Sequence, residues 1–543
     1  MPGFYLALLV IVSAGVYIRL DQFTFQVLLD DEWHVIHQLL FKGPRDLFQT
    51  FGQSDFSIPL ALLYWSELRL FGLSELGMRW PMMLAGISTL LVFPLYVRRY
   101  FDDRVTLVFS LLLAISPLLV LYSRTARPYA LTLVLSLAAI AAIHKYVEAK
   151  KPLFIPGFVY VVCAVASVWL HLISLPMVIA PFLSLGIAAL YDQNWNRIRR
   201  LLGLGLITLA GFLTVVLPPL LGHPEALSVK LGVQAPDLQT YIGVFFVWLG
   251  TPSSGLVLIG VLLAVTGFPT LWRAFPLTPS LLTGLCMTFL VILVSKPAWV
   301  HNPLTLGRYL LLAIPVLLLS ISVGVSRSRD LVTRYWGSTG KYVSLTFILA
   351  VLLLVIHYSP LQKIMKQPNS NSLHSVYQFD FRDEHNLVAL YQKDFPVSPF
   401  WQQLASFPPE SLKIAVSPFS FETHHWDAAR WEQISHQRVM PGYLTGFCID
   451  RRWGEVPNDQ AFKFRNIGYL SDQNDLIDRG FDLVVYQKPQ TVLTNEGKKE
   501  FGMETAGCEI KLREQFSMLI YEDELLLVFS LTEALRGQFD VTR

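Results

Sequence analysis

The amino-acid sequence predicts a polytopic α-helical membrane protein with about 11 transmembrane helices and a soluble α/β domain at the C-terminal end. Two observations lead to this fold class. Of the 543 residues, 53% are hydrophobic and only 15% are charged, whereas an ordinary soluble domain has about 25% charged residues. Apolar runs long enough to cross a bilayer fill the chain up to about residue 358, and none follows. We therefore expect a membrane domain over residues 1–359 and a soluble domain over residues 360–543.

The transmembrane helices are predicted from apolar runs of about 17 to 25 residues. These runs lie near residues 2–20, 80–97, 105–122, 129–147, 153–170, 172–190, 201–220, 241–272, 279–295, 309–325 and 342–358. The run at 241–272 is too long for one straight helix and is interrupted by Gly250, Pro252 and Gly255. We expect a broken helix there, or an interfacial piece followed by a helix.

The orientation in the membrane is predicted from the basic residues, which are concentrated in alternate short loops. Arg98, Lys150 and Arg199 mark three of these loops. The positive-inside rule places them in the cytoplasm together with the N-terminus. The long first loop, about residues 21–79, and the soluble domain then face the exoplasmic side. We expect a multi-pass protein of the plasma membrane, which in a bacterium is the inner membrane with the soluble domain in the periplasm.

The soluble domain contains short β-rich runs separated by helical or loop stretches, a pattern typical of a small α/β domain. These runs cover residues 413–417, 481–486, 516–521 and 525–530. Cys448 and Cys508 also lie in this part of the chain and could form a disulfide in an oxidising compartment. The net charge of the whole chain is only +3, so we do not expect nucleic acid as a partner.

Three successive carboxylates, Asp30, Asp31 and Glu32, open the first exoplasmic loop just outside the first predicted helix. The apolar residues that follow, at positions 33, 36, 39 and 40, have the spacing of an amphipathic helix lying on the membrane surface. The carboxylates are then held at the edge of the bilayer. They either cap this helix or perform chemistry there, and the segment alone leaves both interpretations open.

Arginine and tyrosine residues occur together at two other predicted exoplasmic helix ends. Arg124, Arg127 and Tyr129 form one group, and Arg308 and Tyr309 form the other. Guanidinium groups bind phosphate through bidentate hydrogen bonds, so these residues are candidates for binding a phosphate at the level of the lipid headgroups. Interfacial anchoring in membrane lipids is the alternative.

Histidines are the remaining candidates for contact with substrate or metal. His34 and His37 are three residues apart on the predicted surface helix, and with Asp30 or Glu32 they could bind a divalent metal. Histidines bound to lipid or backbone give the same pattern. His171, at an exoplasmic helix end, either contacts substrate or is satisfied by backbone or water.

Over roughly residues 1–325, the chain resembles the GT-C glycosyltransferases of the protein mannosyltransferase and aminoarabinose transferase type. Four short pieces carry the resemblance: Asp31–Glu32, Gly72–Pro81, Ala126–Leu131 and Gly307–Tyr309. The resemblance implies transfer of a sugar, hexosyl or pentosyl, from a polyprenyl-phosphate carrier on the exoplasmic face, with inversion at the anomeric carbon. Asp31 matches the catalytic aspartate of the family and Glu32 its companion acid. We expect a lipid, a glycan or a protein as the acceptor, and the resemblance does not carry over which of these classes it is.

The sequence departs from the family pattern in the middle of the first loop. Where many members have a basic residue followed by Pro-Pro-Leu, this chain has Ser54–Leu60, with one proline and an acid, Asp55. Asp55 is therefore a possible substrate contact, while acceptor and metal contacts cannot be carried over from the family.

Inverting transfer needs a base for the acceptor proton and positive charge to stabilise the departing phosphate. Asp31 could supply the first, and Arg127 and Arg308 the second. The main rival function is a transporter or flippase for a lipid-linked sugar, which would place ionisable residues near the bilayer midplane, often at broken helices. The charges of this sequence gather at the predicted exoplasmic interface instead.

Overall fold

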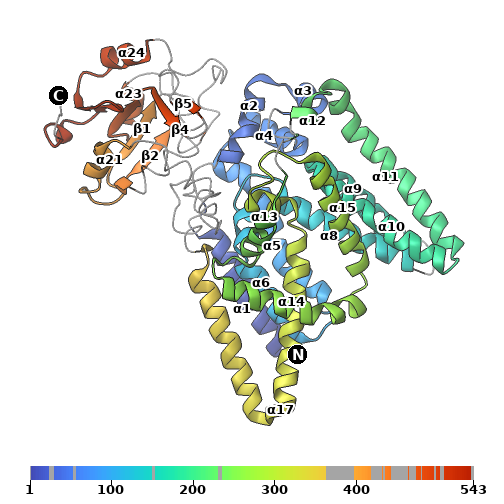
Figure 1. The fold of residues 1–543 in the computed structure, drawn as a ribbon. Helices are drawn as coiled ribbons and strands as arrows, with labels where there is room; N and C mark the ends of the chain where they lie inside the picture. Colours follow the sequence, from blue (N-terminus) through green and yellow to red (C-terminus); the bar gives the residue numbers. More distant parts are fainter. Residues whose placement is uncertain are drawn as a thin grey trace.

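The computed structural model shown in Figure 1 describes the whole fold except for several segments. The residues that it describes are 2–21, 23, 30–52, 57–149, 153–229, 231, 235–361, 397–417, 431, 434–441, 463, 473–478, 480–494, 497–501 and 507–539. At Asp30, Asp31 and His37 only the backbone is described. Asp55 and Cys448 lie outside the described residues.

Every predicted apolar run is helical. The helices are α1 (Pro2–Leu20), α5 (Glu75–Val97), α6 (Asp103–Ile115), α7 (Pro117–Ser123), α8 (Tyr129–Glu148), α9 (Phe154–Leu170), α10 (Leu175–Tyr191), α11 (Trp195–Gly222), α13 (Leu238–Leu249), α14 (Ser254–Ala274), α15 (Thr278–Ser295), α16 (Pro303–Tyr309) and α17 (Ala313–Tyr358). In Figure 1 they form one bundle, from which the two halves of α17 extend as a V. The predicted run at 241–272 is divided at Gly250, as expected, into α13 and α14.

The expected count of 11 transmembrane helices is not confirmed. Within the described part of the chain, seven helices are long and apolar enough to cross a membrane, or nine if each of two bent pairs is one span. The chain bends by 58° between α6 and α7 and by 88° between α16 and the first half of α17. Of the other two predicted spans, α9 has 17 residues, and the second half of α17 is counted only as the apolar helix Ile348–Tyr358 within the described residues. The two bends explain part of the difference, because hydropathy measures the length of an apolar run and not its straightness.

Helices α14 and α17 cross with their backbones in close contact. A Cβ atom on Gly267 would lie 1.9 Å from the carbonyl oxygen of Ser320, and one on Gly324 would lie 2.0 Å from that of Leu263. The Ser320 hydroxyl donates to the carbonyl of Ala264 over 2.7 Å. Small residues permit such close packing in membranes, where apolar side chains gain little by leaving lipid. This crossing fixes the first half of α17, which follows α16 directly.

The first loop contains three helices, α2 (Asp30–Phe41), α3 (Pro44–Gln49) and α4 (Ile58–Leu70). Helix α2 confirms the predicted helix, while its place on the membrane surface stays a prediction. Its residues Ile36 and Leu39 are buried in a cluster with Leu60 and Tyr64 of α4. The apolar side of α2 therefore faces α4, and its N-terminal turn carries the three acidic residues.

The C-terminal region is a small α/β domain, as the sequence predicts. Its sheet has the order β2-β1-β3-β7-β6, formed by β2 (Arg438–Pro441), β1 (Lys413–Ser417), β3 (Leu483–Gln487), β7 (Leu526–Ser530) and β6 (Leu519–Glu522). The pairs β1–β2 and β1–β3 are parallel, whereas β3–β7 and β6–β7 are antiparallel. Strands β4 (Gln490–Thr494) and β5 (Gly497–Phe501) form a separate hairpin.

The two faces of the five-stranded sheet are covered by short helices. Helix α21 (Pro399–Leu404) supplies Phe400 and Trp401 to one buried cluster, and α23 (Gln473–Asp478) and α24 (Cys508–Gln515) supply Leu476 and Leu512 to the other. Cys508 is disulfide-bonded, and Cys448, its predicted partner, lies outside the described residues.

Candidate functional site

The candidate site is centred on α16, a short helix that carries Arg308 and Tyr309 in its last turn. Asn302 caps the helix, because its side-chain oxygen accepts a hydrogen bond from the backbone N–H of Leu304 over 2.9 Å. Pro303 follows at the first helical position, where a missing N–H costs nothing. After Tyr309 the chain turns by 88° into α17, so Arg308 lies at a corner between two helices.

The structure brings four of the predicted site residues together from three distant segments. Tyr129 begins α8, and His171 follows the end of α9. The ring centre of His171 is 5.3 Å from that of Tyr129 and 6.0 Å from that of Tyr309. The guanidinium of Arg308 lies 5.7 Å from the Tyr129 ring and 5.5 Å from the Tyr309 ring, within the range of cation–π attraction. The Arg308 guanidinium is thus within reach of two aromatic rings.

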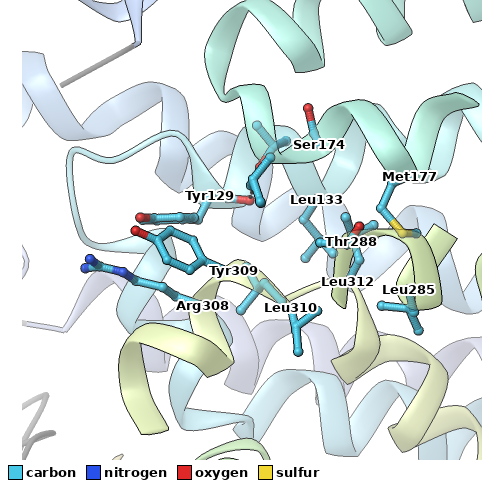
Figure 2. Close-up of a pocket in the computed structure, with 13 residues that line it drawn as sticks. Tyr129, Leu133, Ser174, Met177, Leu285, Thr288, Arg308, Tyr309, Leu310 and Leu312 are labelled. Atoms are coloured by element: carbon cyan, nitrogen blue, oxygen red, sulfur yellow. Dashed lines mark hydrogen bonds between the residues drawn. The ribbon is translucent and has the colours of Figure 1, made fainter. Parts of the chain in front are cut away.

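A cavity lies beside these residues between α8, α10, α15 and α16 (Figure 2). Arg308, Tyr129 and Tyr309 lie at one end in Figure 2, and Met177 and Leu285 lie at the other. The remaining lining is mainly apolar and includes Leu133, Ile173, Leu310, Leu311 and Leu312, with Thr132, Ser174 and Thr288 as the polar exceptions. Its volume of about 20 Å³ is enough for about one water molecule, so a larger ligand requires the lining helices to separate.

Glu32 lies in a buried ion pair with Arg79 of α5, and both side chains are fully buried. Arg79 donates from Nε to Oε1 of Glu32 over 2.7 Å and from Nη2 to Oε2. The backbone N–H of Ala126 donates to the same carboxylate. Glu32 therefore joins α2 to α5 and to the loop before α8. Arg79 was not predicted from the sequence as the partner of Glu32, although it lies within the family-like segment Gly72–Pro81.

Arg124 forms hydrogen bonds with backbone carbonyls at the end of α1, away from the cavity. Its Nη1 donates to the carbonyl of Asp21 over 2.7 Å and to that of Ile18 over 3.3 Å. Burial lowers the pKa of Arg124 to about 10, so the side chain is still protonated at neutral pH. These hydrogen bonds satisfy carbonyl groups left open where α1 ends and direct the Arg124 side chain away from the cavity.

Arg19, the penultimate residue of α1, is fully buried and was not identified from the sequence. Its guanidinium donates to the carbonyls of Leu113 and Ala114 over 3.2 and 3.1 Å and to the Ser123 hydroxyl over 3.3 Å. These carbonyls lose helical partners because the chain breaks before Pro117. Arg19 therefore stabilises the bend between α6 and α7.

For the other predicted site residues that it describes, the structure gives burial or position on a helix, and none of them lines the cavity. Arg127 is buried, with 9% of its surface exposed, and lies between the Glu32-bound loop and Tyr129. His34 is half-buried on α2. Asp31 is in the first turn of the same helix. The role of each of these residues, and of Asp55 and His37, stays a prediction.

Among the described residues, no three or more His, Cys, Asp or Glu side chains come together as a possible metal site. The side chains of Asp31 and His37 are not included in that statement. The possibility of a divalent metal therefore stays open.

Three solved structures show a distant likeness to the chain. The crystal structure of ArnT from Cupriavidus metallidurans in the apo state is 12% identical, with a TM-score of 0.48 over 99% of both chains. The same protein bound to undecaprenyl phosphate is 14% identical, with a TM-score of 0.46 over 98% of this chain and 99% of that one. The Archaeoglobus fulgidus oligosaccharyltransferase tethered to an acceptor peptide is 12% identical, with a TM-score of 0.40 over 89% of this chain and 69% of that one. At these values, nothing about the chemistry of this chain follows from the likeness.

No curated protein matches the chain. Residues 58–221 match the family model described as dolichyl-phosphate-mannose-protein mannosyltransferase. The matched region runs from the start of α4 to the end of α11 and includes Arg79, Tyr129 and His171. The resemblance that the sequence motifs indicate, to the GT-C glycosyltransferases of the protein mannosyltransferase and aminoarabinose transferase type, is therefore confirmed over residues 58–221.

Proposed function

We propose that the protein transfers a sugar from a polyprenyl-phosphate-linked donor to an acceptor on the exoplasmic face of the membrane. The observation that carries this proposal is the cavity with Arg308, Tyr129 and Tyr309 at one end and mainly apolar side chains beyond them. A polyprenyl phosphate has the same division, with one charged group joined to a long apolar chain. Arg308 would bind the phosphate, and leucines such as Leu133 and Leu310 would contact the isoprenoid. The family whose model matches residues 58–221 is also named for a polyprenyl-linked donor, dolichyl-phosphate-mannose.

The exoplasmic placement is supported by the basic residues at the end of the bundle opposite the site. Arg79 and Tyr129 mark the site end, since Arg79 is near the start of α5 and Tyr129 begins α8. The opposite ends of these two helices carry Arg98, which pairs with Asp103, and Lys145. Cytoplasmic loops of membrane proteins are enriched in such cations. The candidate site would then face the periplasm in a bacterium, with the N-terminus in the cytoplasm.

In the proposed inverting reaction, a hydroxyl or amine of a lipid, glycan or protein acceptor attacks the anomeric carbon. The bond from that carbon to the phosphate oxygen breaks, and its electron pair leaves with the phosphate. Arg308 and Arg127 would neutralise this charge. The acceptor proton passes to a base, for which Glu32 is poorly suited because its carboxylate is already bound by Arg79. We assign the base to Asp31, which precedes it in the first turn of α2.

A flippase or transporter would require ionisable groups near the bilayer midplane. The described buried ionisable groups around the site lie instead at helix ends, including Arg19 at the end of α1 and Arg79 near the start of α5. The bend between α6 and α7 has a neighbouring charge, Arg19, but that charge is taken up by backbone carbonyls. This distribution favours chemistry at the headgroup level over transport.

Donor binding is tested by replacing Arg308 with Lys, which keeps the charge but loses the planar fork of donors. Affinity of the detergent-solubilised protein for undecaprenyl phosphate should fall by about 10- to 100-fold, the equivalent of about 1.5 to 3 kcal/mol for a charged hydrogen bond. Arg327→Lys is the matched control. Arg327 lies on α17 far from Arg308, is exposed, and donates to the carbonyl of Thr266 in α14. Equal affinity in wild type and Arg308→Lys would assign Arg308 to interfacial anchoring.

The base is tested by Asp31→Asn, with Asp30→Asn as the control. Asn caps a helix about as well as Asp, so folding should be kept, but the amide cannot take the acceptor proton. Transfer should fall about a hundredfold or more while donor affinity stays unchanged. Wild-type transfer rates in Asp31→Asn would contradict the assignment, and a defect only in Asp30→Asn would shift it by one residue.

A further inference from the structure

Helix α13 lies along α16 and contacts both of its ends through side-chain hydroxyl and indole groups. The indole Nε1 of Trp248 donates to the carbonyl of Gly307 over 3.2 Å. Near the other end, the Thr240 hydroxyl lies 2.8 Å from the carbonyl of His301. That hydroxyl also lies 2.7 Å from Oδ1 of Asp237 and has only one hydrogen to share. The Trp248 indole directs its one N–H to the Gly307 carbonyl and is the more specific of the two contacts.

The Gly307 carbonyl is a position at which such a contact matters. Helix α16 has only seven residues, too few for a stable isolated helix, and the carbonyls of its last turn have no partner within the helix. The indole N–H of Trp248 donates to one of these carbonyls, that of Gly307, one residue before Arg308. The same ring packs against the buried cluster that contains Leu306 and Leu310. Trp248 therefore combines a packing contact with one directed hydrogen bond at the bend into α17.

We propose that Trp248 is a positioning residue for donor binding, because its indole N–H holds the last turn of α16 and thereby keeps Arg308 against the rings of Tyr129 and Tyr309. The inference rests on the proposed function for the identity of the ligand, but the positioning of α16 does not depend on that ligand. Trp248 does not itself line the cavity. Its effect on the donor phosphate is transmitted through the backbone of α16 to the Arg308 guanidinium.

The substitution Trp248→Phe separates the hydrogen bond from the packing, since it removes the N–H and keeps an aromatic ring. Trp272→Phe is the matched control. Trp272 belongs to α14, is 49% exposed and lies beside Phe268, so the same chemical change is made away from the site. Hydrogen exchange of the backbone amides of α16 should become faster in Trp248→Phe and stay at the wild-type rate in Trp272→Phe.

Binding of undecaprenyl phosphate, measured on the intact protein, supplies the second readout. Trp248→Phe should weaken binding about tenfold, the size expected when one buried hydrogen bond is lost, with thermal stability close to wild type. In an Arg308→Gln background the same change should cause no further loss, because a residue that acts through Arg308 has nothing left to position. A purely structural role would weaken binding by the same factor in both backgrounds.

The outcomes separate the inference from the proposed function. Unchanged exchange in α16, or an equal loss of affinity in both backgrounds, would overturn the role of Trp248. If the wild-type protein binds no undecaprenyl phosphate, the proposed donor is wrong. The exchange of α16 then still decides whether Trp248 holds this helix in place.

Discussion

The buried pair between Glu32 and Arg79 gives the most quantitative prediction for stability. Replacing Glu32 with Gln removes the negative charge but keeps an oxygen that can accept from the Ala126 N–H. Arg79 is then left as a buried cation without its carboxylate, since both side chains are fully buried. Breaking a buried ion pair in this way costs about 3 to 5 kcal/mol. We expect Glu32→Gln to fall near the lower value, because the amide oxygen retains part of the hydrogen bonding.

The matched double variant tests whether the cost comes from the charge that Glu32→Gln leaves on Arg79. Glu32→Gln combined with Arg79→Met removes both charges of the pair and keeps nearly the same volume, and such replacements are often close to neutral. Most of the lost stability should therefore return, with a coupling energy between the two positions of about 2 kcal/mol or more. The assay is reversible unfolding in mixed micelles with increasing SDS, followed by tryptophan fluorescence. Wild-type stability of Glu32→Gln, or a double variant whose loss is the sum of the two single losses, would refute the reasoning.

Three further predictions concern packing, pH and topology. Gly267→Ala should lower stability by about 1 to 3 kcal/mol, because its Cβ would meet the Ser320 carbonyl at 1.9 Å; unchanged unfolding would show that the crossing of α14 and α17 is looser than described. Burial raises the pKa of the Glu67 carboxyl. As the pH falls from neutral through the range in which this carboxyl takes up its proton, wild type should therefore gain stability relative to Glu67→Gln. A difference in thermal unfolding that does not change with pH would contradict this. Arg199 lies near the start of α11 and Glu225 lies just after its end. Cysteines introduced at these two positions should differ in intact cells, with only the Glu225 position reacting with an impermeant thiol reagent; equal labelling would contradict the orientation.

Local features of the fold could be predicted because each depends on residues close in sequence. The apolar spacing after Glu32 indicates α2, and the interruption around Gly250 indicates the division between α13 and α14. The sequence also predicts four strands of the sheet. It missed β2 (Arg438–Pro441), a short strand at the edge of the sheet that has no strong alternating pattern.

Features that depend on tertiary structure could not be predicted. Arg79 lies 47 residues from Glu32, and no spacing rule connects them. Arg19 has the sequence context of an ordinary cation at the end of a transmembrane helix, and its buried role depends on carbonyls that the break before Pro117 exposes. The grouping of Tyr129, His171 and Arg308 follows from their predicted positions at the same side of the membrane, but the ring contacts that unite them follow only from the packing of the helices.

The central claim is that the cavity beside Arg308 binds a polyprenyl phosphate, and native mass spectrometry of the protein purified with its own membrane lipids tests it most directly. We predict that wild type retains a polyprenyl phosphate, free or carrying a sugar, and that the fragmented ligand yields the phosphate and isoprenoid masses. Arg308→Gln should retain much less of this ligand than wild type, whereas Arg327→Gln, at the exposed position along α17, should retain as much as wild type. A wild-type protein that retains only phospholipid, or an Arg308→Gln variant that retains the polyprenyl phosphate in full, would contradict the proposed function.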